Sequence, residues 1–242
     1  MMMNEIIVEF AQLRIKIKSR FEYMKTFCKD YLVDGEDYDF EIMVDDQAIK
    51  KMKQELAFSD DYSESLAIYE AIANKLVDYN GIVMHGACIK YLDYGLLFSA
   101  PSGTGKSTHI RLWKQYFKDQ VDIINGDKPI LRFFDDEIRI YGTPYSGKEN
   151  WHKNQSAKLK AICLLKQGKE NQIKKLEPKE AMVAIFAQMY IAKKDEATAI
   201  KTIMMLDRLL QQIPIYELTC NISYEAVEVC YQGLKGELSE ND

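Results

Sequence analysis

The segment from residue 96 to residue 117 constrains the fold more than any other part of the sequence. An apolar run, Leu96 to Ser99, precedes the loop Ala-Pro-Ser-Gly-Thr-Gly-Lys-Ser, residues 100–107, and a helical pattern extends to Phe117. A glycine-containing loop between a strand and a helix binds phosphate because its backbone N–H groups converge and the helix amino terminus adds about half a positive charge. The segment therefore predicts a phosphate-binding loop, although Ala100 replaces the glycine that usually begins it.

The residues of this loop have expected roles in binding a nucleoside triphosphate, ATP or GTP. Lys106 is expected to reach the β- and γ-phosphate oxygens, which also makes it a candidate catalytic residue, and the Ser107 hydroxyl is expected to coordinate Mg²⁺. The predicted nucleotide-binding residues of the loop are Ser102, Gly103, Thr104, Gly105, Lys106, Ser107 and Thr108.

The spacing around the loop predicts an α/β fold with a mixed sheet. The turn from Leu92 to Gly95 is too short to join any strands but antiparallel neighbours. The predicted strand before it, 82–91, should therefore run antiparallel to the strand that enters the loop. The strand 121–124 is reached through a helix, so we expect it beside the loop strand and parallel to it.

Apolar spacing predicts the remaining elements and two domains. Residues 1–60 are expected to form a small α+β subdomain, and residues 61–242 a nucleotide-binding domain. The elements expected in the first part are strands at 6–10, 13–17 and 40–44 and a helix at 21–31. Those expected in the second part, apart from the elements around the loop, are strands at 130–134, 138–141, 159–165 and 215–219 and helices at 63–79, 180–193, 195–213 and 224–234. The role of residues 1–60 is not indicated.

Three residues outside the loop are further candidates. Asp127 follows the strand 121–124, where it could bind Mg²⁺ and act in catalysis, or Asn125 to Asp127 could simply be a turn. His85 lies on the strand that pairs with the loop strand, so its side chain could approach the phosphates, or it could be a core histidine. Lys148 lies in a loop after a strand of the same sheet. It could contact the γ-phosphate or an anionic acceptor, or belong to a solvated lysine-rich face.

Composition excludes several classes of protein. The net charge of −5 does not favour nucleic acid as a partner. The five cysteines are scattered, without the spacing of zinc ligands, so we expect reduced cysteines in a cytoplasmic protein. The amino terminus lacks the pattern of a signal peptide, and no apolar run is long enough to span a membrane.

Three motifs together resemble the superfamily of HPr kinase/phosphorylase and phosphoenolpyruvate carboxykinase (ATP). They are Met84-His-Gly86, the loop from Ser99 to Thr108, and Asn125-Gly-Asp-Lys-Pro129. The segment Gly142 to Lys148 is similar to a loop of short bacterial members described as carboxykinase-like or HPr-kinase-like. The resemblance covers roughly residues 80–235 and implies a P-loop kinase core in the second domain.

The resemblance implies ATP- and Mg²⁺-dependent phosphorylation of a serine or threonine hydroxyl on a peptide or small protein. His85 matches a histidine near the transferred phosphate, and Asp127 matches the second of two adjacent acidic residues. The first of these is replaced by Gly126. Two alternatives stay open beside the protein kinase: a small-molecule kinase, which differs in the acceptor pocket, and a non-catalytic nucleotide-binding module, which the missing carboxylate favours. HPr kinases assemble into hexamers, so this chain could also form an oligomer. Its short length argues against a carboxykinase.

Overall fold

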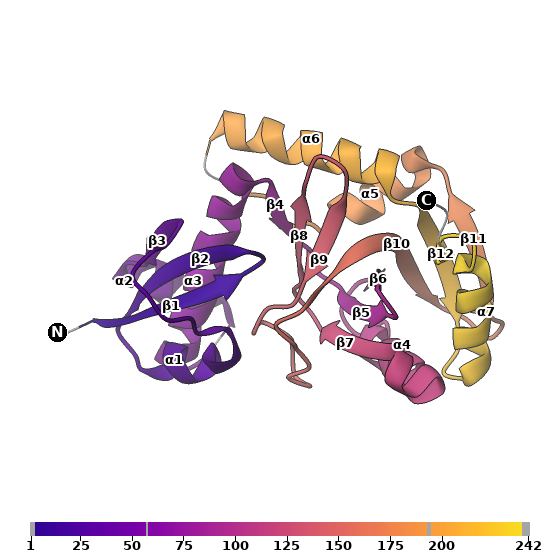
Figure 1. The fold of residues 1–242 in the computed structure, drawn as a ribbon, viewed down its shortest axis with the longest axis horizontal. Coiled ribbons are helices and arrows are strands. Elements are labelled where there is room, and N and C mark those ends of the chain that lie inside the picture. Colours follow the sequence, from indigo (N-terminus) through magenta and orange to yellow (C-terminus); the bar gives the residue numbers. More distant parts are fainter. Residues whose placement is uncertain (1–2, 57, 193–194, 239–242) are drawn as a thin grey trace.

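The computed structural model describes residues 3–56, 58–192 and 195–238, which form two β-sheets with helices around them (Figure 1). The strands are β1 (Asn4–Phe10), β2 (Leu13–Ser19), β3 (Phe40–Met43), β4 (Gly81–Val83), β5 (Ala87–Tyr91), β6 (Tyr94–Ser99), β7 (Val121–Asn125), β8 (Ile130–Phe133), β9 (Ile138–Tyr141), β10 (Ser156–Gln167), β11 (Gln172–Leu176) and β12 (Ile215–Cys220). The α-helices are α1 (Tyr23–Phe27), α2 (Asp46–Leu56), α3 (Asp60–Leu76), α4 (Lys106–Phe117), α5 (Pro178–Phe186), α6 (Glu196–Gln212) and α7 (Tyr224–Leu234). The predicted α/β class is confirmed.

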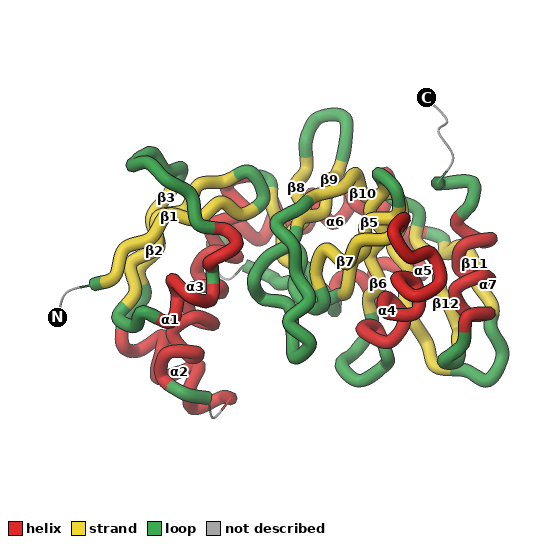
Figure 2. The backbone as a smooth tube through the Cα atoms, turned by 60° about the horizontal axis from the view of Figure 1, so that its bottom comes forward, coloured by secondary structure: helices red, strands yellow, loops and turns green. Residues whose placement is uncertain are grey.

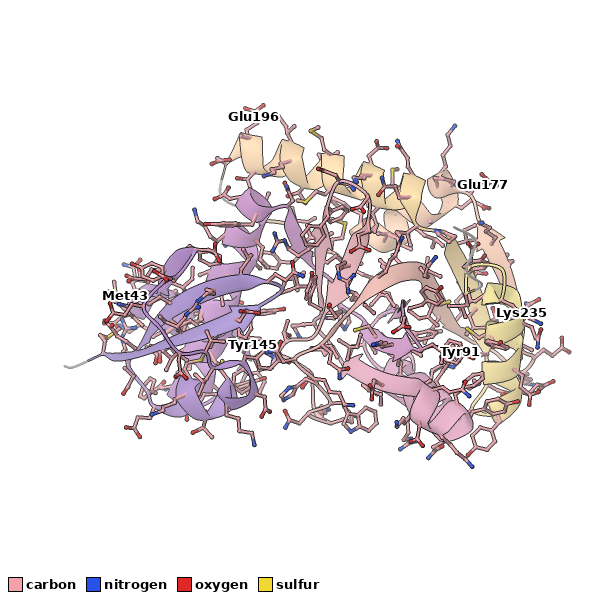
Figure 3. All side chains as sticks on the ribbon, in the orientation of Figure 1. Met43, Tyr91, Tyr145, Glu177, Glu196 and Lys235 are labelled. Atoms are coloured by element: carbon pink, nitrogen blue, oxygen red, sulfur yellow. The ribbon has the colours of Figure 1, made fainter. Side chains whose placement is uncertain are left out.

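The smaller sheet has the strand order β1-β2-β3. The predicted hairpin is confirmed, because β1 and β2 pair antiparallel, with Ala11 and Gln12 at positive φ in the turn between them. Every second residue of β2 is buried. The side chains of Leu13, Ile15 and Ile17 form one apolar cluster with α3 and with Tyr145 of the loop after β9. Figure 3 shows Tyr145 at the junction between the amino-terminal elements and the rest of the chain.

The larger sheet is mixed, as predicted. Its order is β4-β8-β9-β10-β6-β5-β7, and β12 and then β11 extend it from β10. β10 runs parallel to β6 and to β12, whereas β5 runs antiparallel to β6 and to β7. One apolar cluster packs α4 and α7 against one face of this sheet, and another packs α5 and α6 against the other face. Figure 2 shows the strands of the smaller sheet apart from those of the larger one.

Two predictions about the strands near the loop are wrong in part. The predicted strand 82–91 is two strands, β4 and β5, because the backbone N–H groups between them bond to other segments. Those of Met84, His85 and Gly86 donate to Pro129, Gln188 and Asp127, respectively. β7 has the predicted direction, but it lies beside β5 and not beside β6. Since β5 pairs on both of its edges, it separates β7 from the loop strand.

Two predicted helices are shorter than expected, and two elements were not predicted. The helix expected at 21–31 is α1 followed by a 3₁₀ turn at Lys29–Tyr31. The helix expected at 180–193 is α5, which begins in a capping box between Glu177 and Glu180 and ends at Phe186; residue 193 lies outside the described ranges. The elements that the sequence analysis did not predict are α2 and β11. Within the described residues, no helix combines the length and apolar character needed to cross a bilayer.

Candidate functional site

The loop between β6 and α4 is the first part of the candidate site. Gly103 and Gly105 have φ angles of +81° and +113°, in the region that favours glycine. A Cβ atom added to either residue would meet no atom within 4 Å. The backbone angles, and not crowding, therefore explain these two glycines, and the space around the loop is open.

Lys106 begins α4, and its side chain folds back onto the loop. Its Nζ donates hydrogen bonds to the carbonyl oxygens of Ala100 at 2.8 Å and Pro101 at 3.4 Å, and the residue is only 7% exposed. Burial lowers the pKa of the Lys106 ammonium group, whereas the negative charge of Asp127 acts to raise it. Lys106 and Asp127 thus interact electrostatically, although they follow different strands.

Two hollows flank the loop. One, of about 960 Å³, is bounded by residues 99–104, the end of β10 and α5. The other, of about 550 Å³, lies against residues 103–105 and the first turns of α4. Both volumes fall within the range of roughly 300–1,000 Å³ that is common for small-molecule sites. The loop therefore has room for a ligand on both sides.

Asp127 lies just past β7, in a turn that Asn125 holds. The side-chain oxygen of the buried Asn125 accepts hydrogen bonds from the backbone N–H groups of Asp127 at 2.8 Å and Lys128 at 2.7 Å. Its amide nitrogen donates to the carbonyl and hydroxyl oxygens of Thr143. Residues 125–127 are therefore a turn, and the hydrogen bonds to Thr143 connect this turn to the loop after β9.

Both carboxylate oxygens of Asp127 face basic side chains. Oδ1 lies 3.4 Å from His85 Nε2, and Oδ2 contacts Lys128 Nζ. Burial acts to raise the pKa of Asp127, but the hydrogen bonds and charges of His85 and Lys128 outweigh burial and lower this pKa to about 2. The Asp127 carboxyl group is therefore ionised at neutral pH.

His85 lies in the bend between β4 and β5, and it is half-buried. Its Nδ1 lies 2.8 Å from Gln188 Oε1, and its carbonyl oxygen accepts a hydrogen bond from the Ser99 hydroxyl at 2.8 Å. Oxygen atoms therefore face both ring nitrogens, Gln188 Oε1 at Nδ1 and Asp127 Oδ1 at Nε2. His85 thus contacts Asp127 and Gln188, and its side chain is not part of the apolar core.

Gly126 occupies the position where the family resemblance implies a second acidic residue. A Cβ atom added to Gly126 would lie 2.6 Å from the Ser146 carbonyl oxygen, which is closer than real Cβ atoms approach. The loop after β9 therefore fills the space that an aspartate side chain would need. The same loop packs on Asp127, because a Cβ atom on Gly147 would lie 3.1 Å from Asp127 Cβ.

Lys128 and Gln188 belong to this arrangement, but the sequence analysis did not single them out. Lys128 directly follows Asp127 in the motif that carries the family resemblance, so its place in the sequence could have identified it as a candidate site residue. Its carbonyl oxygen accepts hydrogen bonds from the hydroxyl groups of Tyr69 at 2.8 Å and Thr143 at 2.9 Å. Gln188 lies 103 residues from His85, and no local sequence pattern connects the two.

The structure brings Lys106, Asp127 and His85 together at one end of the larger sheet. The other predicted residues of the loop lie at or next to its glycines. Ser102 and Gly103 are exposed, and the half-buried ones are Thr104, Gly105, Ser107 and Thr108. Lys148 is exposed in the loop after β9, directly after Gly147.

Comparisons with known proteins identify a family. Among solved structures, the HPr(Ser) kinase/phosphatase from Coxiella burnetii is similar to this chain, with a TM-score of 0.35 and 10% sequence identity over 64% of this chain and 98% of that chain. This likeness is too weak to support any argument about function. No curated protein matches the sequence. A family model described as "SynChlorMet cassette protein ScmC" matches residues 56–232, which is more than half of the chain. The chain therefore belongs to the ScmC family.

Proposed function

We propose that this protein is an ATP- and Mg²⁺-dependent phosphotransferase that phosphorylates a serine or threonine hydroxyl of a peptide or small protein. The nucleotide is ATP or GTP. The observation that carries the proposal is that the ionised Asp127 carboxylate contacts His85 and interacts electrostatically with the Lys106 ammonium group. The open, glycine-containing loop in front of Lys106 supports it further.

The residues present fit a magnesium nucleotide. The Ser107 hydroxyl and the Asp127 carboxylate are oxygen ligands, which Mg²⁺ prefers. Within the described residues, no cluster of three or more histidine, cysteine or acidic residues forms a metal site by itself. This agrees with the usual binding of Mg²⁺ by one or two protein groups together with the phosphates of the substrate. When bound, Mg²⁺ neutralises charge on the β- and γ-phosphates.

The protein groups would act mainly by positioning and by charge. Lys106 exchanges its bonds to the Ala100 and Pro101 carbonyl groups for the phosphate oxygens. Asp127 orients the acceptor hydroxyl and accepts its proton. Lys128 and Lys148 add positive charge near the transferred phosphate, and His85 can donate a hydrogen bond to it. Lys128 must first leave Asp127, which it contacts in the structure.

Transfer of label tests this function. The purified protein is incubated with Mg²⁺ and γ-labelled ATP in an extract of its source cells, beside a Lys106→Ala control. Label on a discrete peptide or protein, absent with the control, is the expected result. Label on a metabolite would indicate a small-molecule kinase instead. ATP binding without any Lys106-dependent label would indicate a non-catalytic nucleotide-binding module.

A further inference from the structure

A third hollow, of about 410 Å³, reaches Asp127 from the side of the amino-terminal elements. Asp127 and Lys128 line one part of it, and four aromatic residues line another: Tyr23, Phe27, Tyr62 and Tyr145. We call this the aromatic hollow. None of the residues of the glycine-rich loop lines it, and Asp127 lines neither of the two hollows at that loop.

The aromatic wall of this hollow is built by ring-to-ring contacts. The rings of Tyr23 and Phe27 are stacked with centroids 5.4 Å apart, and Tyr23 meets Tyr62 edge-on at 6.2 Å. Phe27 meets Tyr145 edge-on at 4.9 Å. Tyr145 is buried, whereas Tyr23, Phe27 and Tyr62 are only half-buried. These three therefore keep accessible ring surface on the wall of the hollow.

The hollow is nearly balanced in charge. Its lining contains two lysines, Lys29 and Lys128, and two carboxylates, Asp30 and Asp127. The lining also contains one histidine, His152. Burial lowers the pKa of His152 below its ordinary value, so this ring is neutral at neutral pH. Such a lining does not favour a strongly anionic metabolite. It suits a neutral chain segment that carries an apolar side chain, and aromatic rings pack with one another in edge-on or offset geometry.

We propose that the aromatic hollow binds the acceptor as a peptide segment, with a serine or threonine hydroxyl at Asp127 and a neighbouring aromatic side chain against Tyr23, Phe27 and Tyr62. This inference rests on the proposed function. In the reaction, the hydroxyl oxygen forms a bond to the γ-phosphorus while the bond from that phosphorus to the β,γ-bridging oxygen breaks. The hydroxyl proton passes to the Asp127 carboxylate, and the nucleoside diphosphate leaves.

The proposal gives the amino-terminal elements a function. Tyr23 and Phe27 come from α1, and Tyr62 comes from α3. Asp127, Lys128 and the loop after β9 come from the rest of the chain. The nucleotide would then be held by the larger sheet and its loop, while α1 and α3 select the acceptor.

A peptide library tests the proposal on the whole chain. The protein is incubated with Mg²⁺, γ-labelled ATP and serine-centred peptides in which each flanking position is varied in turn. The expected result is label that depends on Lys106 and that favours phenylalanine, tyrosine or tryptophan at a flanking position by about tenfold or more over alanine. Label without an aromatic preference would overturn the inference and leave the proposed function standing. No label on any peptide would overturn both.

Variants then test whether the residues of the aromatic hollow cause the preference for an aromatic flanking residue. Tyr62→Ala should raise KM for an aromatic-flanked peptide about tenfold, without changing KM for ATP or turnover of an alanine-flanked peptide. Tyr62→Phe keeps the ring and should behave like the unmodified protein. Tyr38 is an exposed tyrosine outside the hollow, so Tyr38→Ala is the matched control. Should Tyr62→Ala unfold, Phe27→Leu provides the same comparison. An unchanged peptide KM in a folded variant would refute the aromatic hollow as the acceptor site.

Discussion

The Tyr69 hydroxyl donates a hydrogen bond to the Lys128 carbonyl oxygen at 2.8 Å. A side chain from α3 thereby holds the residue that follows Asp127, and the amino-terminal part of the chain supports the candidate site directly. The Tyr69 ring also stacks on Tyr145, with centroids 3.8 Å apart. The position of Asp127 therefore depends on a contact between segments that lie 59 residues apart.

Removal of that hydroxyl should weaken the fold without unfolding it. Tyr69→Phe keeps the stacked ring, and the Thr143 hydroxyl still donates to the Lys128 carbonyl oxygen. We expect the free energy of unfolding, measured with urea, to fall by about 1 kcal/mol, the usual contribution of one hydrogen bond. Tyr38→Phe, at an exposed ring, should leave it unchanged. Equal values for the two variants would show that the Tyr69 bond contributes nothing.

An aspartate at position 126 should not restore the acidic pair that the family resemblance implies. Gly126 is buried, and even a Cβ atom there would approach the Ser146 carbonyl oxygen to 2.6 Å. We expect Gly126→Asp to lower the free energy of unfolding by more than about 3 kcal/mol, through overpacking and a buried charge. Gly236→Asp is the control, since a Cβ atom at Gly236 would meet no atom within 4 Å. A stable Gly126→Asp variant with increased phosphotransfer would contradict this account.

Asn125 should be important for stability as well as for the site. Its side chain makes four hydrogen bonds, two to the N–H groups of Asp127 and Lys128 and two to Thr143, while fully buried. Asn125→Ala removes all four and leaves buried partners unpaired, so we expect a loss of roughly 2–4 kcal/mol in urea unfolding. Asn154→Ala serves as the control at an exposed position. A loss below about 1 kcal/mol would mean that the turn does not depend on Asn125.

The contact between His85 and Asp127 should matter for phosphotransfer more than for folding. If Asp127 accepts the hydroxyl proton, Asp127→Asn should lower kcat by about 100-fold or more, as for other acid–base groups. His85→Gln keeps a hydrogen-bond donor but removes the imidazole ring, and we expect a smaller loss of about tenfold. Both are measured by transfer of labelled phosphate, with circular dichroism to confirm folding. An unchanged kcat in Asp127→Asn would exclude Asp127 as the base.

The cysteines should differ in reactivity. Cys28, Cys88, Cys163 and Cys230 are fully buried, whereas Cys220 is half-buried. Burial raises the pKa of the Cys28 thiol to about 12, so at pH 8 roughly one Cys28 in ten thousand is a thiolate. We expect iodoacetamide at pH 8 to label Cys220 in the folded protein and all five cysteines after denaturation, as counted by mass spectrometry. Fast labelling of Cys28 under native conditions would show that the amino-terminal core opens.

Local sequence determined the elements around the glycine-rich loop. An apolar run, a turn of four residues and a helical pattern sufficed to predict β5, β6 and α4 and the antiparallel pairing of β5 with β6. The direction of β7 could also be predicted from the sequence. The connection from β6 through the helix α4 reverses the chain direction twice, which makes β7 parallel to β6. Its neighbour could not be predicted, since the second edge of β5 and the second edge of β6 were both open to pairing. Only the assembled sheet shows that β7 pairs with β5 and that β10 pairs with β6.

Tertiary structure decided which side chains meet at Asp127. The sequence singled out Lys106, Asp127 and His85 from motifs, because each type suits phosphate or metal chemistry at its position. Gln188 and Tyr69 could not be found in this way, since they reach the site through contacts across 103 and 59 residues. Long-range contacts of this kind arise from packing and buried hydrogen bonding, and neither leaves a local sequence pattern. The sequence by itself therefore determined the chemistry available at the site, whereas the fold alone determined the partners that orient it.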